Sequence, residues 1–200
     1  MLPPIEPHPV TLEGRHVRLE PLSLAHHDRL CAVGLEGELW RWAQTSLATP
    51  TDMRAYIETA LTWQAQGTAL PFAIIARTTG QVVGSTRYAN IARADGRLEI
   101  GWTWLARSAQ RTPVNTDTKY LLLRHAFEVL GCIRVEFKTD VLNERSRAAL
   151  LRIGAKQEGV LRSHMITASG RVRDSVYFSI LAAEWPAVKV GLEQKLARPV

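Results

Sequence analysis

The sequence predicts a single α/β (α+β) domain built on a central, mixed, mostly antiparallel sheet of about seven strands, with helices on both faces. Three observations support this prediction. Several short segments alternate apolar and polar residues, as half-buried strands do. Compact turns join neighbouring strands, which makes those pairs antiparallel hairpins. One strand–helix–strand order in the second half requires a crossover and therefore a parallel pair.

The first half of the chain should supply a strand, two helices and a hairpin. Ser23 is a residue type that caps helices, and Gly67 can end the second helix. The turn Thr78-Thr79-Gly80 separates two apolar segments and predicts the hairpin. A proline-rich lead, residues 1–12, precedes these elements. The predicted elements are a strand at 17–22, helices at 23–35 and from Thr51 or Asp52 to Gly67, and strands at 72–77 and 81–88.

The second half should supply the rest of the sheet and three helices. Gly131 follows the first of these helices as a C-terminal cap, and Asn143 caps the second. Glu99 points away from the apolar face of its strand. That face carries Leu98, Ile100, Trp102 and Trp104. The predicted elements are strands at 97–105, 133–139, 157–167 and 172–181, and helices at 117–130, 143–153 and 184–200, the last including the C-terminal tail.

Composition narrows the class of protein. The formal net charge is +6, but the basic residues are spread along the chain, so a nucleic-acid partner is not expected; a basic groove for a polyanionic cofactor accounts for the same charge. No apolar run is long enough for a membrane span, and Met1 to Val10 lack the pattern of a signal peptide, which together predict a cytoplasmic protein. Cys31 and Cys132 form no Cys-x-x-Cys pair, so we expect reduced thiols and no metal site.

Three stretches carry recognisable motifs. They are Leu98 to Leu105 on the expected strand, Arg111 to Thr118 before the following helix, and Asn143-Glu144-Arg145-Ser146 with Leu151 to Ala155 and Glu158-Gly159 after it. In this order and spacing they resemble the GNAT acetyltransferases, in particular the branch of the ribosomal-protein N-terminal acetyltransferases RimJ and RimL. The resemblance covers about Val17 to Trp185 and implies the GNAT fold and an acetyl-CoA-dependent N-acetyltransferase.

One motif departs from the family pattern. The GNAT pyrophosphate loop has the form Gln/Arg-x-x-Gly-x-Gly/Ala, whereas Arg111 and Pro113 replace both glycines here. Glycine lets a backbone approach a phosphate closely, and proline offers no N–H. We expect the free amides of the next helix to compensate, with Asp117 facing away from the phosphates. Side-chain donors should come from Arg111, Thr112, Asn115 and Thr116.

The resemblance also implies where the cofactor and the reaction lie. The backbone of the central strand would bind the pantetheine arm and the thioester oxygen, through Trp102, Thr103, Trp104 and Leu105. Asn143 and Ser146 would contact the pantetheine or acetyl end. The tyrosine that many family members carry on this helix as a general acid is absent, so Ser146 or water would serve, or the thiolate would leave without an acid. The region of Trp40 and Trp42 lines the acceptor site in this fold.

Glu99 is the candidate general base because a carboxylate on a central strand is costly without a function or a partner. The alternative is a structural ion pair, with Arg97 or Arg87 as the partner. The acceptor would be an amine that attacks the thioester directly. A peptide or protein N-terminal α-amine, a small-molecule amine (amino acid, polyamine or antibiotic) and a non-catalytic acyl-CoA-binding role all stay open. Pairing through a sheet edge or the last hairpin would allow a homodimer.

Overall fold

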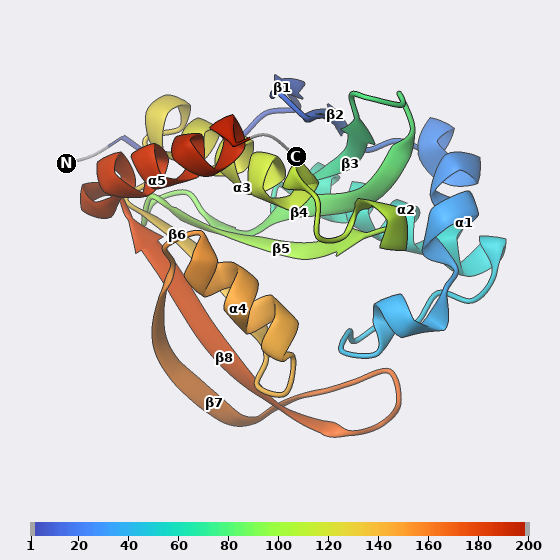
Figure 1. Cartoon of the computed structure of the whole chain (residues 1–200). Helices are drawn as coiled ribbons and strands as arrows, with labels where there is room; N and C mark the ends of the chain where they lie inside the picture. The colour runs from blue at the N-terminus through green and yellow to red at the C-terminus, as the bar shows by residue number, and fades with distance from the viewer. Residues whose placement is uncertain (1–2, 199–200) are drawn as a thin grey trace.

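An eight-stranded mixed sheet organises the chain (Figure 1). The computed structural model describes residues 3–198. The strands follow the order β1-β2-β3-β4-β5-β6-β8-β7, and within this sheet β5 and β6 form the parallel pair while the other neighbours are antiparallel. The strands are β1 (Leu12–Glu13), β2 (Val17–Pro21), β3 (Leu70–Ala76), β4 (Val82–Ala92), β5 (Arg97–Leu105), β6 (Arg134–Asp140), β7 (Lys156–Ile166) and β8 (Val172–Leu181).

Helices cover both faces of this sheet, as predicted. One face carries α3, α4 and α5, with α5 lying beside α3, and the other carries α1 and α2 (Figure 1). The helices are α1 (His27–Gly34), α2 (Pro50–Ala65), α3 (Pro113–Arg124), α4 (Glu144–Arg152) and α5 (Trp185–Ala197). Short helical turns are η1 (Leu24–His26), η2 (Gly37–Trp40), η3 (Arg107–Ala109), the π-helical η4 (His125–Val129) and η5 (Ala182–Glu184). No helix among residues 3–198 is long and apolar enough to cross a membrane.

The sheet separates two hydrophobic cores. The larger core lies under α3, α4 and α5 and includes Leu98, Ile100 and Phe137 from the sheet. The smaller core lies under α1 and α2 and includes Trp104 with Ala73 and Ile75. The two cores hold β3, β4 and β5 from both sides, so the centre of the sheet is a rigid platform for the polar residues described below.

Several predicted boundaries differ from the structure: β4 extends to Ala92, past the predicted end at residue 88, and α1 begins at His27, after the turn η1. The lead contributes a strand, β1, which pairs with β2 and adds an eighth strand to the seven predicted. Helix α3 begins at Pro113, four residues before the predicted start at Asp117. Thr112 caps α3 by accepting a hydrogen bond from the Val114 N–H, and proline fits the first helical position because its missing N–H needs no partner there.

A β-bulge in β5 reverses the predicted orientation of two tryptophans. Gly101 pairs with Arg87 and Trp104 with Ser85, so Trp102 and Thr103 together face one residue of β4. Trp102 has φ +48°, a left-handed conformation that shifts the alternation of side chains. The prediction that Trp102 and Trp104 share a face with Leu98 and Ile100 was therefore wrong. Both rings lie on the α1–α2 side instead.

Candidate active site

The parallel strands β5 and β6 pair over only three residues and then diverge. The last pair is Glu99 with Glu136, although β5 continues to Leu105 and β6 to Asp140. Beyond this pair, the backbone groups of β5 that face β6 have no strand partner among the described residues. The bulge at Trp102 lies in this unpaired segment. The result is an opening between the two strands, with unpaired main-chain donors and acceptors along one edge.

The loop between β5 and α3 lies at one end of this opening. Arg111 has φ +61°, in the left-handed region that favours glycine. The chain therefore keeps the conformation expected of a glycine at this position, although it carries arginine there. Helix α3 starts two residues later, so its first free amides point toward the space beside Arg111.

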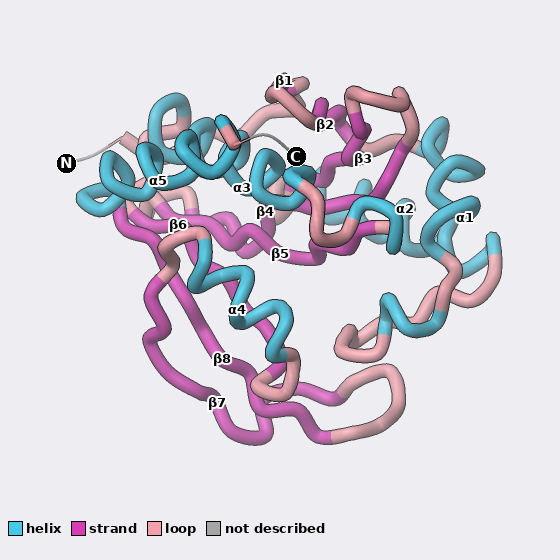
Figure 2. The backbone as a smooth tube through the Cα atoms, viewed as in Figure 1, coloured by secondary structure: helices cyan, strands magenta, loops and turns pink. Residues whose placement is uncertain are grey.

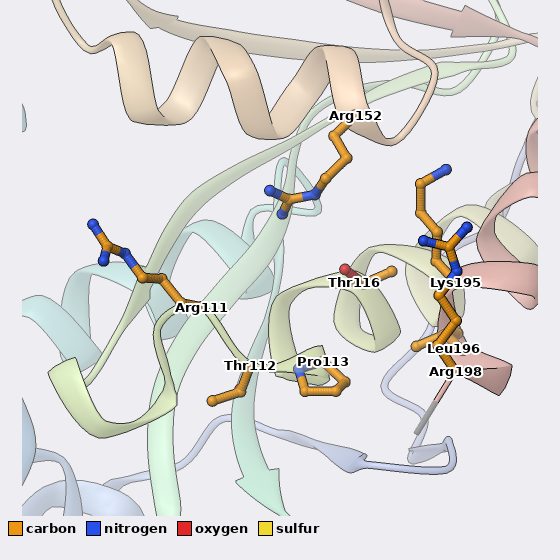
Figure 3. A pocket seen from close by; sticks show the side chains of 8 residues that line it. All are labelled: Arg111, Thr112, Pro113, Thr116, Arg152, Lys195, Leu196 and Arg198. Atoms are coloured by element: carbon orange, nitrogen blue, oxygen red, sulfur yellow. The ribbon is translucent and has the colours of Figure 1, made fainter. Parts of the chain in front are cut away.

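A basic cavity of about 420 Å³ opens beside the start of α3 (Figure 3). Its wall combines the loop with the end of α4 and the end of α5, segments that are far apart in the sequence. The lining contains four basic side chains and no carboxylate, which makes it complementary to phosphate groups. The lining residues are Arg111, Thr112, Pro113, Thr116, Arg152, Lys195, Leu196 and Arg198.

Asp117 does not oppose this charge. Its carboxylate is buried and accepts hydrogen bonds from the backbone N–H groups of His16 at 2.6 Å and Val17 at 3.0 Å. It therefore faces away from the cavity, as the sequence predicted, and anchors the start of β2 to α3. Asn115, also predicted as a cofactor contact, is half-buried in the first turn of the same helix.

The start of α4 supplies the two other predicted cofactor contacts. The Asn143 side chain caps the helix by accepting a hydrogen bond from the Ser146 N–H at 3.1 Å. Both residues are half-buried. The Ser146 hydroxyl makes no hydrogen bond within residues 3–198, so it stays free to contact a ligand.

Glu99 is buried on the α1–α2 side, next to the opening. Its carboxylate accepts a hydrogen bond from the Asn90 amide at 2.8 Å and lies 3.5 Å from the Lys138 ammonium. The Glu99 carboxylate fits beside Gly101 because glycine has no side chain; a Cβ at this position would lie 2.8 Å from Glu99 Oε1. The predicted alternative partners were wrong, because Arg97 pairs with Asp95 and Glu136 instead.

Arg87, the other predicted partner of Glu99, is held by aromatic rings. Its guanidinium lies 4.9 Å, 5.2 Å and 5.3 Å from the ring centroids of Tyr56, Trp63 and Trp102. The side chain is almost completely buried, and its Nε and Nη2 have no hydrogen-bond partner in the described part of the chain. These cation–π contacts fix the Trp102 ring on the same side of the sheet as Glu99.

The loop after η2 reaches the turn between β7 and β8, and these two segments form one wall (Figure 2). The Ala168 N–H donates to the Ala43 carbonyl at 3.3 Å, and Arg173 Nη1 donates to the Trp42 carbonyl at the same distance. Arg171 lies over the Trp42 ring and pairs with the buried carboxylate of Asp140. Trp42 is therefore fixed as a half-buried part of this wall.

Trp40 does not reach the wall. Its ring packs against Tyr56 and Trp104 in the smaller core, and its indole N–H donates to the Gly34 carbonyl at 2.8 Å. The prediction that both tryptophans line the acceptor site needs correction for Trp40. It holds η2 in place, and only Trp42 stays a candidate for contact.

Two polar residues at the opening were not predicted. Lys119 on α3 is buried and donates a hydrogen bond to the Thr103 hydroxyl at 2.7 Å. A lysine on a helix is usually solvent-exposed, and the signal that could have indicated burial is its position one turn before Leu122 and Leu123. Tyr177 on β8 faces Lys138, whose ammonium lies 5.7 Å from the ring centroid. Its register opposite Lys138 depends on the long β6–β8 pairing, which a single sequence does not specify.

Comparison with known proteins identifies relatives along most of the chain. Residues 16–156 match the family model described as the acetyltransferase (GNAT) domain. The uncharacterized N-acetyltransferase p20 of Bacillus licheniformis is 27% identical over 176 residues, which are 88% of this chain and 98% of p20. A Bacillus subtilis protein named as a ribosomal N-acetyltransferase, YdaF, is 34% identical over 110 residues, 55% of this chain and 59% of YdaF.

Solved structures share the same fold. A GCN5-related N-acetyltransferase from Brucella melitensis superposes with a TM-score of 0.91 at 34% identity, covering 98% of this chain and 90% of that protein. Mycobacterium smegmatis RimJ, solved in complex with CoA-disulfide, superposes with a TM-score of 0.82 at 23% identity, covering 94% and 95% of the two chains. The sheet and its flanking helices therefore have the same overall fold as these proteins.

Proposed function

Because the chain belongs to the GNAT acetyltransferase family and is an N-acetyltransferase, we propose that it transfers the acetyl group of acetyl-CoA directly to a protein N-terminal α-amine. The observation that carries this proposal is the opening between β5 and β6. A basic cavity lies on one side of it and the Glu99 carboxylate lies on the other. A phosphate-bearing donor and an amine can therefore approach the same point from opposite faces of the sheet.

The residues of the cofactor side fit acetyl-CoA. Arg111, Arg152 and Lys195 supply positive charge for its phosphates, and the free amides at the start of α3 supply backbone donors. The unpaired edge of β5 from Trp102 to Leu105 can accept and donate hydrogen bonds to the pantetheine arm. Asn143 and Ser146, at the start of α4, are the proposed contacts for the pantetheine or acetyl end. Acetyl-CoA supplies an activated thioester when bound.

Glu99 is the proposed base on the acceptor side. It can accept the proton that the amine loses as nitrogen attacks the thioester carbon, either directly or through one water. Asn90 and Lys138 hold its carboxylate in place. Trp42 is the proposed contact for the part of the acceptor beyond the amine. The unpaired amides of β5 are the proposed donors to the developing oxyanion.

The bonds that Glu99 already makes favour an α-amine over a lysine side chain. At pH 7, neutralising a lysine amine costs about 4.6 kcal/mol, whereas an α-amine costs about 1 kcal/mol. The Glu99 carboxylate already bonds the Asn90 amide and the Lys138 ammonium. An α-amine loses its proton readily and therefore asks little of such a carboxylate. The name of YdaF, a ribosomal N-acetyltransferase, also supports a protein acceptor.

An acceptor panel tests the proposal. Purified protein is incubated with acetyl-CoA and one of four acceptors: a lysine-free peptide with a free N-terminus, an N-blocked peptide with one lysine, a polyamine, or a mixture of free amino acids. Thiol release gives the rate, and fragment mass spectra give the acetylated atom. We expect the free N-terminus to be acetylated at least tenfold faster than the blocked peptide.

The other outcomes have definite meanings. Faster turnover with the polyamine or the amino acids would replace the protein acceptor with a small-molecule amine. Binding of acetyl-CoA without thiol release from any acceptor would indicate a non-catalytic acyl-CoA-binding module. The absence of acetyl-CoA binding would contradict the proposal as a whole.

A further inference from the structure

Lys119 is a buried lysine without a carboxylate partner. Its residue is 6% exposed, and its ammonium makes one hydrogen bond within residues 3–198, to the Thr103 hydroxyl at 2.7 Å. No carboxylate of the described chain lies within ion-pair distance of it. A buried ammonium is costly unless it is paired or has a function. The ammonium can donate three hydrogen bonds, so two donors are available for another group.

The position of this ammonium is set by three elements that meet at the opening. Lys119 extends from α3, the Thr103 hydroxyl belongs to β5, and the Phe137 ring, 5.9 Å from Nζ, belongs to β6. Phe137 directly follows Glu136, the last residue of β6 that pairs with β5. The ammonium therefore lies where the two strands diverge. Thr103 is itself held by Thr86 of β4, through a hydroxyl contact of 2.7 Å.

Lys119 and Glu99 approach this point from opposite faces of the sheet. Lys119 comes from α3, which covers the larger core. Glu99 lies on the α1–α2 face with Lys138 and Trp102. The basic cavity also lies on the α3 side. If the cofactor phosphates lie in that cavity, the thiol leaving group departs on the Lys119 side of the sheet. The incoming amine then meets Glu99 on the other side.

We propose that the Lys119 ammonium donates the proton to the CoA thiolate when the acetyl group is transferred, which makes it a further catalytic residue. The inference rests on the proposed function. The C–N bond forms as the amine attacks the carbonyl carbon, the C–S bond breaks, and its electron pair goes to sulfur. Sulfur takes a proton from Lys119 Nζ. The neutral lysine recovers a proton from solvent, and the proton lost by the acceptor passes to Glu99 or water, so the step balances.

Two other side chains are weaker candidates for this role. The Ser146 hydroxyl is a poor acid near pH 7, although it can still hydrogen-bond the thiolate. Tyr177 lies beside Lys138 on the Glu99 face, away from the side of the leaving group. Burial raises the pKa of Tyr177, which makes it a weaker proton donor. Lys119, on α3, thus takes the role of the tyrosine that is absent from α4.

The acidity of Lys119 suits the role. Burial lowers its pKa from 10.5 to about 7, and the charge on Glu99, acting across the opening, opposes this in part. An acid with a pKa near the working pH transfers protons most effectively. The side chains packed around the ammonium, Thr103 of β5 and Phe137 of β6, carry no charge, so Glu99 is the charged neighbour that acts on it.

The test measures the thiol of bound CoA as well as turnover. The ultraviolet absorbance of the thiolate is followed against pH for CoA bound to the wild-type protein and to Lys119→Met, with the ligand-free protein subtracted. An adjacent ammonium should lower the pKa of the bound thiol by about 1–3 units. The thiol should titrate at a distinctly higher pH in Lys119→Met. We expect this variant to lower kcat about 10²–10⁴-fold and to leave KM for acetyl-CoA within a few-fold.

Matched variants separate this role from a structural one. Lys119→Arg keeps the charge but cannot lose a proton near neutral pH, so the bound thiol should stay acidic in this variant. In the wild type, kcat should fall above about pH 7 as Lys119 loses its proton. This fall should be absent from Lys119→Arg. Tyr177→Phe should leave the titration of the bound thiol near that of the wild type, because Tyr177 lies on the Glu99 face. An identical thiol titration in wild type and Lys119→Met, or an unchanged kcat, would overturn the inference while leaving acetyl transfer intact. Failure of the wild type to bind CoA would instead refute the proposed function.

Discussion

The Lys138 ammonium lies 3.5 Å from the Glu99 carboxylate, and both side chains are nearly buried beside the opening between β5 and β6. A lysine on one parallel strand thus neutralises a carboxylate on the other, just past the point where the strands separate. The pair holds the proposed base in a fixed position. A substitution that removes one of the two charges leaves the other buried without its ion-pair partner, which destabilises the fold.

Removing one member of this pair should cost more stability than removing both. Lys138→Met leaves the Glu99 charge buried and without its ion-pair partner, and we expect a loss of about 3–5 kcal/mol in the free energy of unfolding. The double variant Glu99→Gln/Lys138→Met should recover most of this loss. Urea unfolding of the two single variants and the double variant measures the coupling. Losses that simply add in the double variant would show that the two side chains are independent.

The basic cavity should account for much of the affinity for acetyl-CoA. Arg111→Ala and Lys195→Ala each remove a charged donor from its lining, and a charge-assisted hydrogen bond is worth about 1.5–3 kcal/mol. We therefore expect Kd to rise about 10–150-fold in each variant, as measured by isothermal titration at low salt. The control is Arg162→Ala on the exposed part of β7. Equal affinity in wild type, Arg111→Ala and Lys195→Ala would place the cofactor elsewhere.

Asp117 should matter for stability and not for cofactor binding. Asp117→Ala leaves the buried N–H groups of His16 and Val17 without an acceptor. Each unsatisfied group costs about 1–3 kcal/mol, so thermal unfolding should occur at a lower temperature. The Kd for acetyl-CoA should stay within a few-fold of the wild-type value. A large gain in affinity would mean that the carboxylate repels the phosphates and so faces the cavity.

Lys119 should make the ligand-free protein more stable as pH rises above 7. Its pKa is about 7 in the folded chain and 10.5 in the reference state, so the unfolded chain binds more protons between these values. The free energy of unfolding should therefore rise with pH, by up to about 1.36 kcal/mol per unit. Measurements should stop near pH 8.5, because a second group acts in the opposite direction at higher pH. Burial raises the pKa of the Cys132 thiol from 9.0 to about 12, so above pH 9 this thiol lowers the free energy of unfolding as pH rises. Lys119→Met should remove this rise, and an equal slope in both proteins would contradict it.

Most of the fold could be predicted from local patterns. The hairpins, the strand–helix–strand crossover and the five helices follow from alternation, caps and turn residues that act over a few positions. β1 was missed because two residues carry no periodic signal. The start of α3 was misplaced because Pro113 was read as part of a loop, whereas Thr112 caps a helix that begins with it.

The bulge in β5 was not predicted because the alternation from Leu98 to Trp104 is uninterrupted in the sequence. The extra residue becomes visible only in the pairing with β4, where Trp102 takes a left-handed conformation. That single change moves two tryptophans to the other face and turns Thr103 toward Lys119. A prediction from alternation requires regular strand pairing, so it is wrong where the bulge at Trp102 interrupts that pairing.

Sequence reasoning missed several contacts at the candidate site. Glu99 lies beside the opening and Arg111 lines the basic cavity, but the partners of Glu99 and the burial of Trp40 were not foreseen. These features depend on contacts between segments far apart in the chain. Lys119 was missed for the same reason, because its burial requires β5, β6 and α3 together.

A crystal structure of the protein with CoA would show whether the cofactor lies between β5 and β6. We expect its phosphates to lie at the start of α3 among Arg111, Arg152 and Lys195. The pantetheine should follow the edge of β5 from Leu105 to Trp102, and the sulfur should lie between β5 and β6. Lys119 should approach the sulfur from the α3 face of the sheet, and Glu99 should lie on the opposite face. CoA bound on another surface, or a sulfur remote from the opening, would show that the proposed cofactor site is wrong.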